Sequence, residues 1–201
     1  MVVGYHLIWT AYGWWLPNDP RGSMSEEIRV ERIAGLGDLH YGRKTAQPVS
    51  SEIRAFYQQA GRTLLCPLLT LEGKDIAVVA ASFAETIHER RYTCYACAIM
   101  PDHVHMLIRR HRDKAEEMIE HLQSASRDAL VAAGRRDDFH PVWGGPGWKV
   151  FLESQADMRR IVAYIRNNPV KAGRPVQEWD FVKPYDGWMP RYAFQRQKRK
   201  S

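Results

Sequence analysis

The chain has 201 residues, with 29 Lys or Arg against 23 Asp or Glu, so its formal net charge is +6. With 45% hydrophobic and 26% charged residues, the composition is that of a folded globular protein and excludes disordered and fibrous classes. The charge makes nucleic acid a partner to test, because clustered cations release counterions when they bind a phosphate backbone.

The sequence also predicts a compartment. No run approaches the roughly 18 apolar residues of a membrane helix, and the N-terminal segment lacks the cleavage site of a signal peptide. Three cysteines do not resemble a secreted disulfide framework. Cys94 and Cys97 have CxxC spacing, but in a strand a separation of three sends side chains to opposite faces, so we interpret them as small buried hydrophobes. We therefore expect a cytoplasmic protein without a membrane partner.

The first half of the chain predicts one strand and two helices. Aromatic and β-branched residues predict a strand over 5–12, which ends at a run of Gly, Pro and Asn. Residues 23–70 have no sustained period except for a helix over 50–65, so we interpret this segment as an insertion or extra helix. Apolar residues at helical spacing predict a second helix over 74–90.

In the second half, strands and helices alternate. We predict two strands, a helix, a strand and a helix, over 92–100, 103–110, 113–133, 148–152 and 154–168. Pro101 and Asp102 supply the turn of a hairpin between the first two strands. Ser154 caps the last helix with Asp157 three residues on, and Pro169 is expected to end it.

This order of elements predicts an α+β fold. Apart from the extra helix it is the βαββαβ pattern of a ferredoxin-like antiparallel sheet, with helices on one face, central first and third strands, and an appended C-terminal helix. We predict one domain over 1–190 and a basic, flexible tail over 191–201. The tail carries five of the six net charges, which leaves 24 basic and 23 acidic residues before it.

Two histidines form the first candidate site. His103 and His105 are two apart in a predicted strand, so their imidazoles share a face and are able to grip one cation while Val104 packs into the core. For an isolated pair of this spacing, a strand with one solvated face is the more common explanation. The other six histidines show no such pairing, and we interpret them as surface or satisfied core residues: His6, His40, His88, His111, His121 and His140.

The C-terminal helix supplies two further candidates. Tyr164 and Asn168 lie one turn apart on the flank of its apolar stripe, where a hydroxyl is able to reach the sheet and an amide oxygen to serve as a third metal ligand. The alternative is structural: a tyrosine covering the helix edge and an asparagine at a helix end.

Three segments together resemble a known family. Residues 100–108 (MPDHVHMLI) and 162–173 (VAYIRNNPVKAG) resemble the signature segments of single-tyrosine HUH transposases, especially the REP-associated tyrosine transposases. The opening segment YHLIWTAYGWWLPNDPRGS resembles the start of one branch of that family. The resemblance runs from residue 5 to 173, with no recognisable motif in about 23–70.

This resemblance implies a metal-dependent single-stranded DNA endonuclease and strand transferase. Tyr164 would be the nucleophile and form a 5′-phosphotyrosine, while His103, His105 and Asn168 would hold Mg²⁺ or Mn²⁺. Relatives often have Gln where this chain has Asn168. The implied substrate is a hairpin or palindromic repeat. Insertion-sequence relatives act as dimers, so a homodimer is one possible state.

Single-stranded DNA is usually held by aromatic stacking in a basic groove. The stacking candidates are Trp14 and Trp15, together with Trp143 and Trp148 around a Gly-rich loop. The cations expected to contact phosphates are Arg21, Arg109, Arg110, Arg160, Arg166 and Lys171. Core packing of the tryptophans and solvation of the charges are the alternatives. Two other functions remain open: a non-catalytic or domesticated nucleic-acid-binding module, and a relaxase or replication-initiation nickase.

Overall fold

A computed structural model describes residues 1–190, so the predicted basic tail over 191–201 lies outside the described residues. The strands are β1 (Gly4–Thr10), β2 (Cys94–Ile99), β3 (His103–Arg109) and β4 (Trp148–Leu152). The helices are α1 (Glu31–Ala34), α2 (Ser50–Thr63), α3 (Gly73–Arg90), α4 (Ala115–Ala132) and α5 (Gln155–Lys171). In residues 1–190 no helix is both long and apolar enough to span a membrane.

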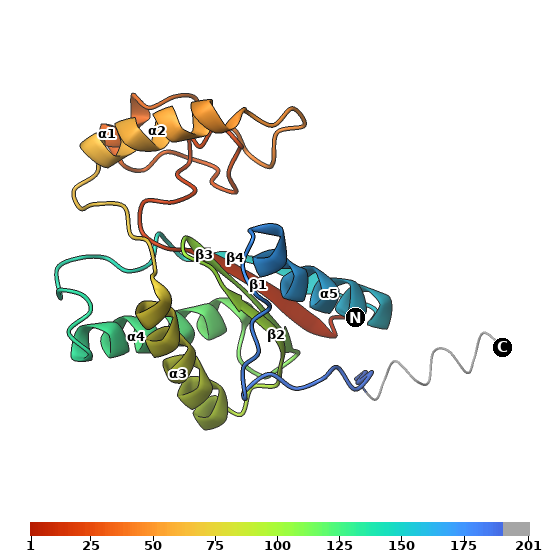
Figure 1. The fold of residues 1–201 in the computed structure, drawn as a ribbon. Coiled ribbons are helices and arrows are strands. Elements are labelled where there is room, and N and C mark those ends of the chain that lie inside the picture. The colour runs from red at the N-terminus through yellow and green to blue at the C-terminus, as the bar shows by residue number, and fades with distance from the viewer. Residues whose placement is uncertain (191–201) are drawn as a thin grey trace.

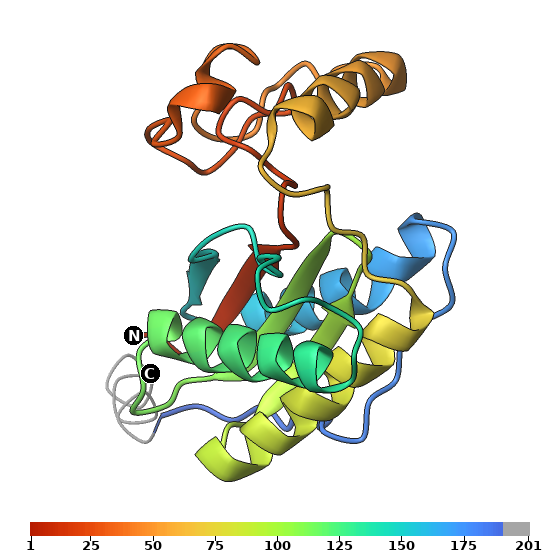
Figure 2. The same ribbon diagram turned by 90° about the vertical axis from the view of Figure 1, so that its left-hand side faces the viewer.

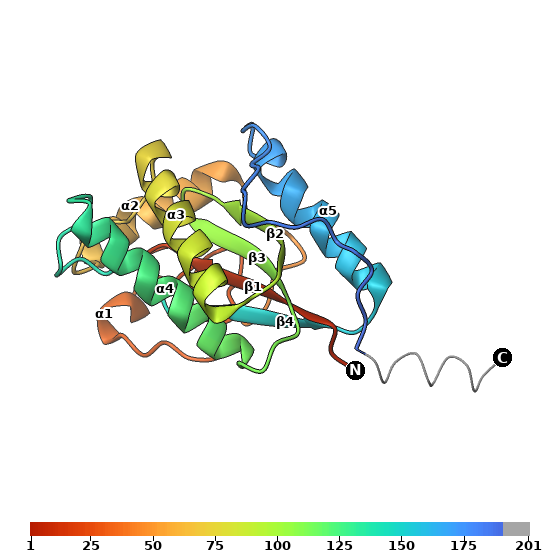
Figure 3. The same ribbon diagram turned by 90° about the horizontal axis from the view of Figure 1, so that it is seen from below.

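The predicted α+β fold is confirmed, because the four strands form one antiparallel sheet in the order β2-β3-β1-β4. The first and third strands are central, as expected. Helices α3 and α4 cover one face and α5 covers the other (Figures 1 and 3). A layer of helix on each side lets both faces of the central strands be buried.

Strand alternation divides the side chains of β1 and β3 between the two faces. Leu7 and Trp9 on β1, with Val104 and Met106 on β3, pack in the core beneath α3 and α4. The residues between them, including those of the histidine pair, therefore face α5. This alternation is what makes a polar site possible on an otherwise apolar sheet.

Helix α5 begins as predicted but does not end as predicted. The Ser154 hydroxyl accepts a hydrogen bond from the backbone N–H of Asp157 and donates one to its carboxylate. The helix continues through Pro169 to Lys171, so the predicted termination is wrong. A proline removes one backbone donor, and so close to the C-terminal end the last turn still closes, through the Ala172 N–H to the carbonyl of Pro169 at 3.0 Å.

The two spaced cysteines are buried, but not on opposite faces. Cys94 and Cys97 both lie in the core under α3 and α4, because the register of β2 shifts at Cys94 and Ala96. A β-bulge inserts one extra residue into a strand, so two residues that are three apart across a bulge point to the same face. Burial raises the pKa of the Cys94 thiol to about 12, which keeps it protonated.

The chain between β1 and α3 forms a separate lobe (Figure 2). It contains α1 and α2, and its own small core is formed by Phe56, Tyr57 and Ala60 with Trp14, Leu16, Leu36, Ile53 and Leu68 packed around them. The lobe thus includes residues 13–22, which precede the predicted insertion at 23–70. Two chain segments join it to the rest of the fold, one from the end of β1 and the other leading into α3.

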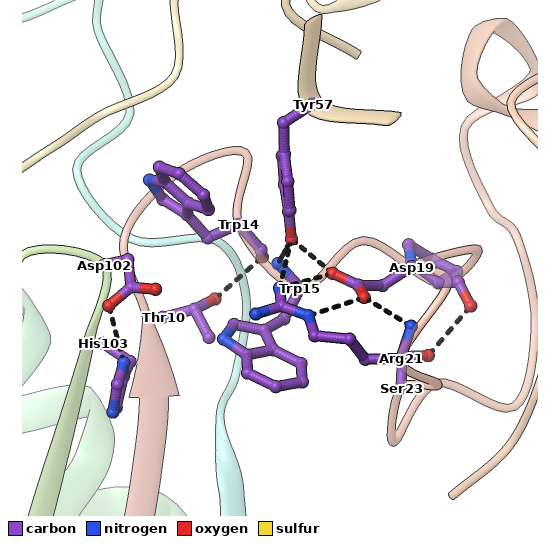
Figure 4. A network of polar contacts seen from close by, with 10 residues as sticks. Thr10, Trp14, Trp15, Asp19, Arg21, Ser23, Tyr57, Asp102 and His103 are labelled. Atoms are coloured by element: carbon purple, nitrogen blue, oxygen red, sulfur yellow. Dashed lines mark hydrogen bonds and ion pairs between the residues drawn. The ribbon is translucent and has the colours of Figure 1, made fainter. Parts of the chain in front are cut away.

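A buried ion-pair network holds the lobe together (Figure 4). Asp19 is 1% exposed and accepts two hydrogen bonds from the Arg21 guanidinium, at 2.9 and 2.7 Å, and one from the Tyr57 hydroxyl. Arg21 also donates to the Tyr57 hydroxyl at 2.7 Å and stacks on the Trp15 ring at 3.7 Å. Burial and the Asp19 charge together raise the pKa of Tyr57, so its hydroxyl stays neutral.

We expect Asp19→Ala to destabilise the protein by about 3 kcal/mol, because it leaves the half-buried Arg21 charge without its partner. Urea unfolding measures this loss. Glu27→Ala is the matched control, since it removes an exposed ion pair to Arg29 in the same lobe and is expected to change stability by under about 1 kcal/mol. Equal effects of the two substitutions would contradict a structural role for the network.

Candidate active site

The histidine pair shares one face of β3, as predicted, and this is the face that α5 covers. The ring centroids of His103 and His105 are 4.9 Å apart, while Val104 between them is fully buried on the opposite face. His105 pairs across the sheet with Ile8, and His103 with Thr10 at the end of β1. The pair therefore lies at the end of the sheet that faces the lobe.

The Nδ1 atom of each histidine is held by a polar neighbour. His103 Nδ1 lies 2.7 Å from the carboxylate of Asp102, and His105 Nδ1 lies 3.0 Å from Nε2 of His6. Within residues 1–190, neither His103 Nε2 nor His105 Nε2 forms a hydrogen bond to another group. Metal-binding imidazoles are commonly fixed through their second nitrogen in this way. The residues therefore fit a divalent metal bound through two Nε2 atoms.

Tyr164 completes the cluster from the opposite side. Helix α5 packs on β2 and β3, and the Tyr164 ring is edge-on to His105 at 5.4 Å and to His6 at 5.9 Å between centroids. Its side chain is 42% exposed, so the phenol is open to a large substrate. The Lys171 ammonium lies 5.7 Å from the centre of this ring. The predicted tyrosine and histidines are thus brought together although they come from different segments.

Asn168 lies one turn beyond Tyr164 and is half-buried. In residues 1–190 no group of three His, Cys, Asp or Glu side chains has the arrangement of a metal site. A metal bound by His103 and His105 therefore needs a ligand of another kind, such as an amide oxygen or a substrate phosphate oxygen. Ligation by Asn168 stays a prediction.

Burial keeps the imidazoles of His6 and His105 neutral. Desolvation and, secondarily, the Arg160 charge lower the pKa of His6 to about 4. Desolvation also lowers the pKa of His105, with contributions from His103 and His6. Both rings are therefore uncharged at neutral pH and retain a lone pair, which is the form that binds a metal.

These shifts predict that acid destabilises the metal-free protein. Unfolded histidine has a pKa near 6.5, so between pH 6.5 and 4 the unfolded chain binds a proton at His6 that the folded chain does not, and stability falls as the pH falls. We expect a loss of about 2 kcal/mol from His6 between pH 7.5 and 5. Urea unfolding in EDTA at the two pH values measures it, and a pH-independent stability would contradict the burial of neutral imidazoles.

Sequence analysis missed His6, which it grouped with surface and core histidines. His6 is 5% exposed and lies in the middle of β1 on the same face as His105. The available signal was the alternation of side chains along the strand. Every residue of a strand that is predicted to be central points to one of two covered faces, so this alternation places His6 on one of them. The register of the β1–β3 pair, which brings His6 beside His105, does not follow from the sequence.

The predicted DNA contacts near the lobe have structural partners. The Trp14 indole donates to the Leu69 carbonyl at 2.7 Å and packs against Tyr57, so its ring serves the lobe core. The Arg21 guanidinium forms an ion pair with Asp19. Trp15 is 36% exposed, and Figure 4 shows the Trp15 and Arg21 pair between the lobe core and the Asp102 and His103 pair.

The remaining predicted contacts divide by position. Arg109 pairs with Gly4 at the far end of β3 from His103 and lies 4.8 Å from the Trp188 ring, and Arg110 follows it. Arg109 is six positions along the strand from His103, or about 20 Å, so Arg109 and Arg110 are not brought to the site. Arg160 and Arg166 are exposed on α5. Arg160 pairs with Asp157 at 3.0 Å, and its charge lowers the pKa of His6.

No family model and no curated protein matches the chain. Among solved structures, the chain is similar to a REP-associated tyrosine transposase bound to a REP hairpin, with 12% identity, a TM-score of 0.45, and 86% of this chain and 70% of that chain covered. It is also similar to a candidate transposase from Deinococcus radiodurans R1, with 14% identity, a TM-score of 0.37, and 88% and 94% covered. At these identities the similarity concerns the fold, so function is inferred from the site itself.

Proposed function

We propose that the chain is a metal-dependent enzyme that nicks and rejoins single-stranded DNA, as an HUH-type tyrosine transposase does, with Tyr164 as its nucleophile. The observation that carries the proposal is the contact of Tyr164, which is 42% exposed, with His105 at 5.4 Å between ring centroids. A half-exposed phenol beside imidazoles with free nitrogens suits attack on a phosphodiester.

In the proposed reaction the Tyr164 oxygen attacks a DNA phosphorus. An O–P bond to the tyrosine forms while the bond to the 3′ oxygen of the preceding nucleotide breaks. The tyrosine loses its proton and the departing 3′ oxygen gains one, which leaves a 5′-phosphotyrosine and a free 3′-OH. Attack by another 3′-OH reverses these changes and releases Tyr164. Because one phosphodiester replaces another, joining needs no nucleotide triphosphate.

His103 and His105 would hold the metal, with Asn168 as the proposed third ligand. A bound Mg²⁺ or Mn²⁺ would act as a Lewis acid on the scissile phosphate. Imidazole and amide donors suit Mn²⁺, whereas Mg²⁺ prefers oxygen ligands. Asp102 would orient His103, and α5 would hold Tyr164 over the pair through its buried residues Met158, Ile161 and Ile165.

The proposed substrate is a hairpin or palindromic repeat end. Lys171 lies against the Tyr164 ring, and it would contact phosphates together with Arg160 and Arg166 of the same helix. Trp15, which is 36% exposed, would stack on a base. In a homodimer, the second copy would pair with the free edge of β4. Within residues 1–190, β4 pairs only with β1, and it exposes Val150 and Phe151.

The test is incubation of the protein with labelled single-stranded DNA hairpins and Mn²⁺ or Mg²⁺. We expect a covalent protein–DNA adduct that survives denaturing electrophoresis and is lost in EDTA. DNA binding without an adduct, with every hairpin and both metals, would instead support the non-catalytic binding module. A nickase that does not rejoin DNA would form the adduct but fail to transfer it to a second 3′-OH.

A further inference from the structure

We propose that His6 is a positioning residue that fixes the protonation and orientation of His105, and so presents His105 Nε2 to the metal. This inference rests on the proposed metal site but concerns a residue outside both signature segments. It would make the site an assembly of two strands and one helix, with β1 supplying His6, β3 the two proposed ligands and α5 the tyrosine.

Burial of the His6 imidazole costs free energy unless its polar atoms have partners. Its ring is 5% exposed on a central strand, where an apolar residue would be buried without loss of hydration. Its Nε2 lies 3.0 Å from His105 Nδ1, and its ring centroid lies 5.0 Å from that of His105 and 5.9 Å from that of Tyr164. Of the charged groups, Arg160 influences His6 from α5. His6 thus joins both proposed functional groups of the site.

The contact between the two rings is informative because a neutral imidazole carries one proton. If His6 Nε2–H donates, His105 must carry its own proton on Nε2, which removes the lone pair that a metal needs. If His105 Nδ1–H donates to His6 Nε2, then His105 Nε2 is free and His6 carries its proton on Nδ1. Only the second arrangement allows ligation through Nε2, and it matches His103, whose Nδ1 faces the Asp102 carboxylate.

His6 is not itself a suitable ligand in this arrangement. Its Nε2 is used by His105, and His6, His103 and His105 do not form a metal-binding group of three within the described residues. A neutral nitrogen acceptor is also distinct from the carboxylate beside His103, so the two ligands would differ in basicity. His6 would therefore act through His105 rather than on the DNA.

The first measurement uses the metal-free protein. Long-range ¹H–¹⁵N correlation spectra at pH 7.5 distinguish the protonated from the unprotonated ring nitrogen. We expect both His105 and His6 to carry their proton on Nδ1. A His105 ring protonated on Nε2, with His6 as the donor, would overturn the inference. Because this measurement needs neither metal nor DNA, it is independent of whether the enzyme forms an adduct.

The second measurement is Mn²⁺ affinity by calorimetry on folded variants. His6→Phe keeps a ring but removes the acceptor, and we expect affinity to fall about 10- to 100-fold. His6→Gln retains an amide oxygen acceptor and is expected to stay within a few-fold of wild type. His88→Phe, on an exposed position of α3, is the control. Unfolding curves confirm that each variant is folded, and unchanged affinity of folded His6→Phe would contradict the inference.

The outcomes separate this inference from the proposed function. If wild-type protein binds Mn²⁺ and His6→Phe weakens binding, but no DNA adduct forms, the positioning role holds and the transposase function fails. If an adduct forms and His6→Phe binds Mn²⁺ and reacts as wild type does, the function holds and the positioning role fails. Wild-type protein that does not bind Mn²⁺ would contradict both.

Discussion

Replacement of Tyr164 by Phe is expected to abolish the covalent adduct with single-stranded DNA. The substitution removes the oxygen that would form the bond to phosphorus but keeps the ring that packs beside His6 and His105. The side chain is 42% exposed, so the folded structure is expected to change little. Electrophoresis of the labelled adduct measures the loss, and hairpin binding by the variant should be retained.

Tyr41→Phe is the matched control for this prediction. Tyr41 is 52% exposed in the lobe, away from the histidine pair, and its replacement is expected to leave the adduct unchanged. An adduct that persists in Tyr164→Phe would show that another group is the nucleophile. Loss of the adduct in both variants would point to a general defect of the protein instead.

The second large effect is expected for His105→Ala. The substitution removes a proposed metal ligand and leaves Nε2 of His6 without its partner, so we expect adduct formation to slow by at least about 100-fold. Initial rates at saturating hairpin and several Mn²⁺ concentrations measure the change. His105 is buried, so unfolding curves must first show that the variant is folded.

His88→Ala is the control, because His88 is exposed on α3 on the other side of the sheet. Its adduct rate is expected to equal that of wild type. A folded His105→Ala variant that reacts at the wild-type rate would contradict the assignment of the metal site. Partial recovery at high Mn²⁺ is expected if His103 alone retains weak binding.

Much of the sheet was predictable, because strand and helix periods are local properties. A spacing of two was enough to place His103 and His105 on one face, and helical spacing put Tyr164 on the flank of α5. The ring contact between Tyr164 and His105 was not predictable from either period. It depends on how α5 crosses the sheet, which is determined by packing between distant segments.

The wrong predictions have local physical reasons. A single bulge changed the parity of Cys94 relative to Cys97, and strand spacing alone cannot reveal a bulge. Pro169 lies so near the end of α5 that the loss of one backbone donor is tolerated. The DNA contact expected of Arg21 stays a prediction, but its pairing with Asp19 and Tyr57 was not predictable, because these residues reach it only in the folded lobe.

The segment after α5 was also not predicted. Residues 174–190 run along the edge of β2, where the Gln177 amide hydrogen-bonds both the N–H and the carbonyl of Ile99 at 2.8 Å. Further along, Val182 bridges to Cys94 and Asp186 accepts from the Tyr95 hydroxyl at 3.0 Å. This segment satisfies the β2 edge without regular secondary structure, so it carries no periodic signal.

The most direct test of the central claim is to identify the residue that becomes attached to DNA. Trypsin cuts after Arg160 and Arg166, so the peptide IVAYIR contains Tyr164 as its only tyrosine. After reaction with a hairpin and Mn²⁺ and digestion of the DNA, mass spectrometry should find a 5′-linked nucleotide on Tyr164 of this peptide. A nucleotide on any other residue, or none after a hairpin has been cut, would contradict the proposed mechanism.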